Sequence, residues 1–150
     1  VDLNAAKLAF AARLGAVPVN ARDQDPVKEI LRLTNGRGVD ASLEVIGTAR
    51  AMEQAVEVLA AGGRAALAGL TDQRMSIAPY RDLLNKEAEI IGVSDHLVGE
   101  LRELMDLVVG GKLDLSKVVS RIVPLDADAI NGVLDDLEAC RDDVRSVVVP

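Results

Sequence analysis

Hydrophobic positions recur every three or four residues in some segments of the chain and form short continuous runs in others. The first spacing puts apolar side chains on one face of an α-helix, so those segments predict helices. Four of these helices begin at residues that cap helix N-termini well: Asn4, Asp25, Thr48 and Asp126. Pro26 supports the second of them, because proline fits the first helical position, where no N–H is needed. A short helix is predicted from Pro79, and another over 101–108.

The continuous apolar runs between these helices predict strands at 16–20, 39–47, 64–70, 89–93, 117–124 and 145–150. Most are apolar along their whole length, which is typical of parallel strands covered on both faces. Pro18 places the first run at a sheet edge. Glycine pairs, among them Gly62-Gly63, are expected to close the helices that precede them. The alternation of strands and helices predicts the α/β class, with a doubly wound, mostly parallel sheet.

The composition of the chain argues against several classes of partner. The 150 residues suffice for one domain with its own core. A net charge of −7 repels nucleic-acid phosphates, and a single Phe and a single Tyr provide no platform for stacking bases. We therefore expect no nucleic-acid partner. No apolar run approaches the ~20 residues that cross a bilayer, and no signal peptide is visible, so we expect no membrane partner and a cytoplasmic location.

Residues able to carry out a reaction are scarce. Cys140 is the single cysteine and His96 the single histidine, so the sequence predicts neither an internal disulfide nor a zinc site. We expect Cys140 to be a small core residue and His96 to be solvated. The sequence indicates no catalytic residue and no metal ligand.

Asp2 is the first candidate for binding a ligand, since it follows an apolar residue and precedes a helix. In a dinucleotide-binding sheet the second strand ends in an acidic residue, whose carboxylate accepts hydrogen bonds from the adenosine ribose. Such a carboxylate also repels a 2′-phosphate and thus favours NAD over NADP. An ordinary surface aspartate is the alternative.

Four segments carry a resemblance to a known family: VDLNAAKLAFAARLGA, GRGVDASLEVIG, AAGGRAALAGL and VRSVVV. In this order and spacing they resemble the cofactor half of the medium-chain dehydrogenase/reductase family, most closely its zinc-type alcohol dehydrogenases. The resemblance covers essentially the whole chain. It implies a partial Rossmann-like fold, NAD as cofactor and, in the parent enzyme, zinc-assisted hydride transfer between an alcohol or carbonyl substrate and NAD. It also implies a homo-oligomer, because the family dimerises through the edge strand near 89–93.

The resemblance further implies cofactor contacts at Asp2, Leu3, Asn4, Lys7, Val45, Ile46, Gly47, Ala68, Gly69, Leu70, Val93, Ser94 and Arg145. The first four match the ribose and adenosine contacts. Residues 45–47 match the turn that borders the adenine and the nicotinamide side of the cleft. Residues 68–70 match the backbone against the nicotinamide ring, and residues 93–94 the contact to its carboxamide. Arg145 matches an arginine that reaches a cofactor phosphate.

Three of these positions have ordinary alternatives. Lys7 also fits a solvated helix lysine. Gly47 also fits a tight strand-to-helix connection without a ligand. Arg145 also fits a surface ion pair with Asp142 or Asp143.

The sequence departs from the family at its start. The glycine-rich turn G-x-G-x-x-G is expected about 20 residues before Asp2, and it is absent with its strand and helix. The two cysteines and the histidine or acidic residue that hold the family's zinc are absent too, and neither Cys140 nor His96 matches them. We therefore expect a C-terminal piece of a longer dehydrogenase, inactive by itself. We also expect weak NAD binding, because the helix N-terminus that receives the pyrophosphate is missing.

These departures predict a particular arrangement. Residues 1–94 would form a partial dinucleotide-binding domain, and residues 95–150 would complete it and return to the absent catalytic domain. The strands near 39–46, 64–70 and 89–93 would form the core sheet. In the strand order 3-2-1-4-5-6 the missing first strand is central, so the strand at 17–20 would lack its neighbour. We expect it to move beside 39–45 or to pair with another molecule as a dimer or swapped assembly.

Two other functions stay open. One is the cofactor half of a zinc-independent quinone oxidoreductase, which usually takes NADPH; the charge of Asp2 disfavours that cofactor. The other is a non-catalytic dimerisation or binding module, which the missing glycine-rich turn favours slightly.

Overall fold

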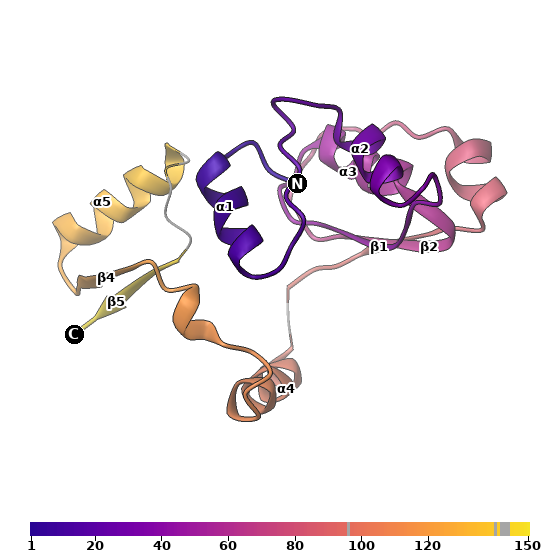
Figure 1. Ribbon diagram of the computed structural model, residues 1–150. Helices are drawn as coiled ribbons and strands as arrows, with labels where there is room; N and C mark the ends of the chain where they lie inside the picture. The colour runs from indigo at the N-terminus through magenta and orange to yellow at the C-terminus, as the bar shows by residue number, and fades with distance from the viewer. Residues whose placement is uncertain (96, 140, 142–144) are drawn as a thin grey trace. The chain divides into compact units, whose positions relative to one another are not determined.

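The computed structural model describes residues 1–95, 97–139, 141 and 145–150 (Figure 1). Contacts divide it into two compact units: residues 1–3 with 18–95, and residues 4–17 with 96–150. The expectations for His96 and Cys140, and the ion pair of Arg145 with Asp142 or Asp143, lie outside the described residues. The domain division at residues 94 and 95 stays a prediction.

The first unit is built on a three-stranded parallel sheet. Its strands are β1 (Val39–Glu44), β2 (Leu59–Leu67) and β3 (Glu89–Gly92), in the order β1-β2-β3. Both pairings are parallel, which confirms the predicted core sheet and the α/β class. Parallel pairing brings the carboxyl ends of all three strands to one edge, where α/β sheets bind their ligands.

Two helices of this unit, α2 (Pro26–Leu33) and α3 (Ala49–Glu57), lie on the same side of β1 and β2 in Figure 1. Local chemistry explains their starts: the Asp25 carboxylate accepts hydrogen bonds from the first turn of α2, and the Thr48 hydroxyl accepts one from the first turn of α3. The core between α3 and the sheet consists of Val56, Leu59 and Ala65. Burying a valine or leucine side chain in this way stabilises by about 1.5–3 kcal/mol.

The sheet is covered differently on its two faces within this unit. On the α3 face, the Ser42 hydroxyl donates a hydrogen bond to the Ala55 carbonyl oxygen at 2.7 Å. On the other face, Leu43 is 69% exposed, and Ile91 is exposed as well. The full coverage of both faces that the apolar runs predict is therefore not provided by the described residues of the first unit.

The start of β2 corrects the sequence prediction. The strand begins at Leu59, five residues before the predicted position, and Gly62-Gly63 lies inside it instead of closing a helix. The register explains the pair of glycines. Val39 is opposite Leu59, but Ala41 is opposite Arg64, so β2 bulges between these pairs. A Cβ on Gly63 would lie 2.9 Å from the carbonyl oxygens of Val39 and Ala60, closer than real Cβ contacts.

The predicted strand at 16–20 needs a second correction. Only Asn20 pairs, in an isolated parallel bridge with Asp2. The Asp2 N–H donates to the Val19 carbonyl oxygen, and the Ala21 N–H donates to the Asp2 carbonyl oxygen, both at 3.1 Å. The expectation that this segment moves beside 39–45 is therefore wrong, because Asp2 supplies its backbone partner. Pairing with another molecule stays a prediction.

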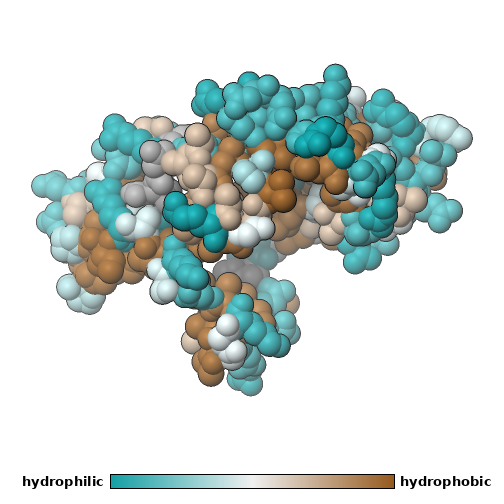
Figure 2. All heavy atoms as spheres, viewed as in Figure 1, coloured by the Kyte–Doolittle hydropathy of each residue, from teal (hydrophilic) through white to brown (hydrophobic). Residues whose placement is uncertain are grey.

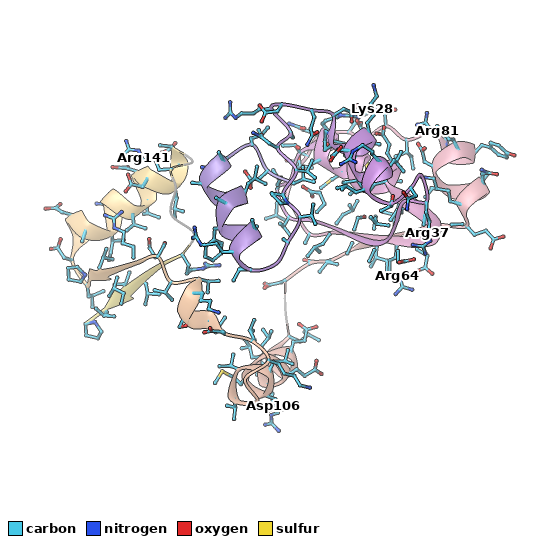
Figure 3. The ribbon with its side chains drawn as sticks, in the orientation of Figure 1. Lys28, Arg37, Arg64, Arg81, Asp106 and Arg141 are labelled. Carbon is cyan, nitrogen blue, oxygen red and sulfur yellow. The ribbon has the colours of Figure 1, made fainter. Side chains whose placement is uncertain are left out.

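The chain between β2 and β3 contains the short helical segment predicted from Pro79. It forms one π-helical turn, η1 (Pro79–Leu83), followed by the 3-10 turn η2 (Leu84–Lys86). Asp82 is 2% exposed there, and its carboxylate accepts hydrogen bonds from the Ala78 N–H at 2.8 Å and from Arg81 Nε at 2.7 Å. The Arg81 side chain, labelled in Figure 3, is itself exposed. The hydrogen bond from Arg81 is the main cause that lowers the pKa of Asp82.

The second unit contains α1 (Ala5–Arg13), α4 (Val98–Val109), α5 (Ala127–Glu138) and a two-stranded parallel sheet of β4 (Arg121–Pro124) and β5 (Ser146–Val149). Asn4 and Asp126 cap α1 and α5 as predicted. The strand predicted over 117–124 is shorter than expected, because residues Leu115–Lys117 form the 3-10 turn η3, capped by Asp114.

Helix α4 exposes apolar side chains, including Leu101, Leu104 and Met105. Figure 2 shows this hydrophobic surface in brown on the part of the chain that Figure 1 labels α4. In the parts of the chain that the structure describes, neither α4 nor any other helix has the length and hydrophobicity to cross a bilayer.

The bulge predicts a difference between two glycines of the same sheet. Gly63→Ala should lower the free energy of unfolding of the chain by about 1–3 kcal/mol, since the added Cβ meets fixed backbone oxygens. Gly92→Ala in β3 is the matched control: nothing lies within 4 Å of its Cβ position, so the change should stay within about 0.5 kcal/mol. Urea unfolding measures both, and equal losses would contradict the bulge.

The Asp82 contacts predict a pH-dependent stabilisation. Asp82→Asn should lower the free energy of unfolding by about 1–3 kcal/mol at neutral pH, because a charge-assisted hydrogen bond is lost. Since the folded-state pKa lies below the unfolded value of about 3.9, the stabilisation is complete above that pH. It disappears as the pH falls through the folded-state pKa. Urea unfolding between about pH 3 and 7 measures the difference, with the exposed Asp72→Asn as control; a difference independent of pH would contradict it.

Candidate functional site

Two turns meet at the carboxyl edge of the first unit's sheet. Residues 45–47 follow β1, and residues 68–70 follow β2. The glycines of the two turns touch: a Cβ on Gly47 would collide with the Leu70 backbone, and a Cβ on Gly69 would collide with Gly47. Gly47 also has a φ of +86°, which disfavours other residues. The structure thus brings together six of the predicted cofactor residues, Val45, Ile46, Gly47, Ala68, Gly69 and Leu70.

The side chains of these turns offer an apolar surface to water. Leu70 is 90% exposed, and Val45 and Ile46 are both about two-thirds exposed, at 66% and 67%. Ligand pockets are mostly lined by apolar side chains, with a few polar groups that fix orientation. The exposed apolar side chains at this edge of the sheet would therefore suit a ligand with a flat ring system.

Val93 and Ser94 follow the third strand at the same edge. The Val93 N–H donates a hydrogen bond to the Leu67 carbonyl oxygen at 2.9 Å, which holds the end of β3 beside the end of β2. Both side chains are exposed. The segments after all three strands are thus presented along one edge.

Sequence analysis missed Glu44, the last residue of β1. Its side chain is 4% exposed, and Oε1 accepts hydrogen bonds from the Ile46 and Gly47 N–H groups, both at 2.8 Å. Its carbonyl oxygen accepts hydrogen bonds from the Ala68 N–H at 2.8 Å and the Gly69 N–H at 3.2 Å. The glutamate inside the predicted strand VDASLEVIG could have indicated this residue, because charged side chains are rarely buried unless they have a partner.

Asp2 and Leu3 belong to the same unit. The backbone of Asp2 is held by Val19 and Ala21, so its position depends on the segment that follows α1 in the sequence. The Leu3 carbonyl oxygen accepts a hydrogen bond from Arg22 Nε at 2.8 Å. The Asp2 side chain is half-buried, and Leu3 is exposed.

The other three predicted residues belong to the second unit. The Asn4 side-chain oxygen accepts hydrogen bonds from the Ala6 and Lys7 N–H groups, so this oxygen caps α1. Lys7 is half-buried in the first turns of that helix. Arg145 pairs with Ser120 through its backbone: its carbonyl oxygen accepts from the Ser120 N–H at 2.9 Å, and its N–H donates to the Ser120 hydroxyl.

A metal centre has no support in the described ranges. They contain no group of three or more His, Cys, Asp or Glu side chains arranged to hold a metal ion. Zinc therefore does not fit the side chains that the structure describes.

A sequence model for zinc-binding dehydrogenases matches residues 1–110. An alcohol dehydrogenase of Cupriavidus necator is 32% identical over 136 residues, covering 84% of this chain and 35% of that protein. The solved structure of the alcohol dehydrogenase of Aeropyrum pernix is 31% identical, with a TM-score of 0.83, over 99% of this chain and 41% of that one. The structure of 2R,3R-butanediol dehydrogenase from Bacillus subtilis is 26% identical, with a TM-score of 0.87, over 99% of this chain and 42% of that one. The chain thus spans about a third of the curated relative's length.

The contact between the two turns predicts the effect of one methyl group. In Gly69→Ala the added Cβ meets the Gly47 backbone and lies 2.6 Å from Glu44 Oε2, so the turns must separate. We expect a loss of about 1–3 kcal/mol in the free energy of unfolding, together with shifted amide NMR signals at Ile46 and Gly47.

Gly132→Ala in α5 is the control for this substitution. Its Cβ position is open, so the helix should keep its stability or gain up to about 1 kcal/mol. Unmoved amide signals at Ile46 and Gly47 in Gly69→Ala would refute the contact between the turns.

Proposed function

Because the chain belongs to the zinc-binding dehydrogenase family, we propose that it is the cofactor-binding part of a longer NAD-dependent alcohol dehydrogenase. The whole enzyme would transfer hydride between an alcohol or carbonyl substrate and NAD. The observation that carries the proposal is the meeting of residues 45–47 and 68–70 at the carboxyl edge of the parallel sheet.

The first unit would bind the two ends of the dinucleotide with different residues. The Asp2 carboxylate would accept hydrogen bonds from the adenosine ribose hydroxyls, beside Leu3. Residues 45–47 would border the cleft between adenine and nicotinamide, and the backbone of residues 68–70 would lie against the nicotinamide ring. Val93 and Ser94 would contact the carboxamide. The exposed apolar side chains of these turns support this assignment, because they suit the flat faces of the rings.

Three further residues would add polar contacts. We assign Asn4 and Lys7 to the adenosine and its ribose, and Arg145 to a cofactor phosphate. Because the Asn4 side-chain oxygen caps α1, the cofactor contact that we assign to this residue would involve another of its atoms.

The chemistry divides between this chain and the rest of the enzyme. NAD would supply the hydride acceptor, and a zinc ion held outside the described residues of this chain would polarise the substrate oxygen. The described residues of this chain provide no zinc site, so its part would be to bind and orient the cofactor. The chain by itself would be inactive. We further propose a small alcohol or carbonyl substrate, a homo-oligomer and a cytoplasmic location.

Replacing Asp2 tests the proposal in the full-length enzyme. Asp2→Ala should raise the KM for NAD about 10- to 100-fold, because the ribose loses charge-assisted hydrogen bonds. It should also lower the preference for NAD over NADP at least about tenfold, since the repulsion of the 2′-phosphate is removed. Steady-state kinetics with both cofactors and a series of alcohols measure these changes.

Asp72→Ala is the matched control, because it makes the same change in net charge at an exposed position and should leave both constants unchanged. A wild-type preference for NADP would indicate the quinone oxidoreductase function instead. Absence of any oxidoreductase activity would indicate the binding module.

A further inference from the structure

Two carboxylates are buried in the described part of the chain, and they are stabilised in different ways. Asp82 forms an ion pair with Arg81. Glu44 forms no ion pair among the described residues, and its Oε2 is buried with no hydrogen-bond partner there. A buried carboxylate without a cation loses several kcal/mol of hydration, which the fold must offset.

The strand register gives no reason for a carboxylate at this position. Glu44 lies opposite Leu67 in the parallel register, so an apolar side chain would suit the neighbouring strand. The N–H groups that Glu44 binds belong to Ile46 and Gly47, in partly buried hydrogen bonds at the turn after β1. A buried acid with one unsatisfied oxygen, whose other oxygen organises a turn of the candidate site, points to a role in function.

The contacts of Glu44 show what that role is. Oε1 holds the Ile46 and Gly47 N–H groups, while the main-chain oxygen holds those of Ala68 and Gly69. The other carboxylate oxygen packs on Gly69, where a Cβ would lie only 2.6 Å from it. One residue therefore connects both turns of the candidate site to the end of β1.

We propose that Glu44 is a positioning residue for NAD: its buried carboxylate holds the Ile46 and Gly47 N–H groups and packs on Gly69, which keeps residues 45–47 and 68–70 at the separation that the dinucleotide requires. The inference rests on the proposed function and adds a residue that does not itself touch the cofactor. Rigid turns bind more tightly because the ligand does not have to order them. Contacts of this kind act on the bound cofactor equally in the ground state and the transition state, so their loss appears in KM more than in kcat.

Three variants of the full-length enzyme test the proposal. Glu44→Leu replaces the acceptor with an apolar side chain that suits the neighbouring strand. It should raise the KM for NAD at least about tenfold and change kcat less than about threefold. Glu44→Gln keeps an acceptor oxygen for Ile46 and Gly47 and should restore KM to within about threefold of the wild type.

Ser42→Ala is the matched control on the same strand and the same face. It removes the hydrogen bond to the Ala55 carbonyl oxygen, away from the turns. Thermal unfolding should shift down by about 2–4 °C while the KM for NAD stays unchanged. Glu44→Leu should show the reverse: an unchanged or raised unfolding midpoint and a raised KM.

Amide NMR signals provide a readout that needs no cofactor. Glu44→Leu should shift the signals of Ile46 and Gly47, whose N–H groups lose their acceptor, and the signal of Gly69, on which the carboxylate packs; Glu44→Gln should shift them less. An unchanged KM for NAD in Glu44→Leu would overturn the inference while leaving the proposed function intact, as would an equal rise in KM in Ser42→Ala. A wild-type enzyme without NAD-dependent turnover would overturn both.

Discussion

The parallel register between β1 and β2 is the constraint on which the first unit depends. From Ala41 opposite Arg64 to Glu44 opposite Leu67, the two strands advance together and end together. Because they end together, the turns that follow them must share a small space. Gly47 and Gly69 satisfy that condition, since only residues without a Cβ fit where the two backbones touch. The bulge at Gly62-Gly63 establishes this register earlier in β2.

The first unit buries two acidic side chains, and each of them is stabilised by a different kind of partner. Asp82 is paired with the exposed Arg81, an arrangement that lets solvent stabilise the cation while the anion stays buried. Glu44 relies on backbone N–H groups at the sheet edge. The first arrangement stabilises the connection between β2 and β3, whereas the second organises the turns that we assign to the cofactor.

The chain belongs to the zinc-binding dehydrogenase family, and the cofactor role that we propose for it would give these local features a common purpose. A parallel sheet with small residues at its carboxyl edge suits a dinucleotide, because backbone atoms must approach the rings and phosphates closely. In the described residues the chain contributes no metal site. Binding and orientation of the cofactor is the role that we propose for its own residues at this edge.

The sequence by itself determined the features that depend on neighbouring residues, above all the helix starts. The caps at Asn4, Asp25 and Thr48 need only neighbouring N–H groups, so the helix starts were predicted correctly. The apolar runs and their order also predicted the parallel core sheet and placed residues 45–47 and 68–70 at strand ends. Only the tertiary structure decided the start of β2, the pairing of Asn20 with Asp2 and the burial of Glu44. Each of these depends on backbone groups distant in sequence or on packing between strands. A hydrophobic pattern along one chain does not show which residues of two segments will pair or which polar side chain they will bury.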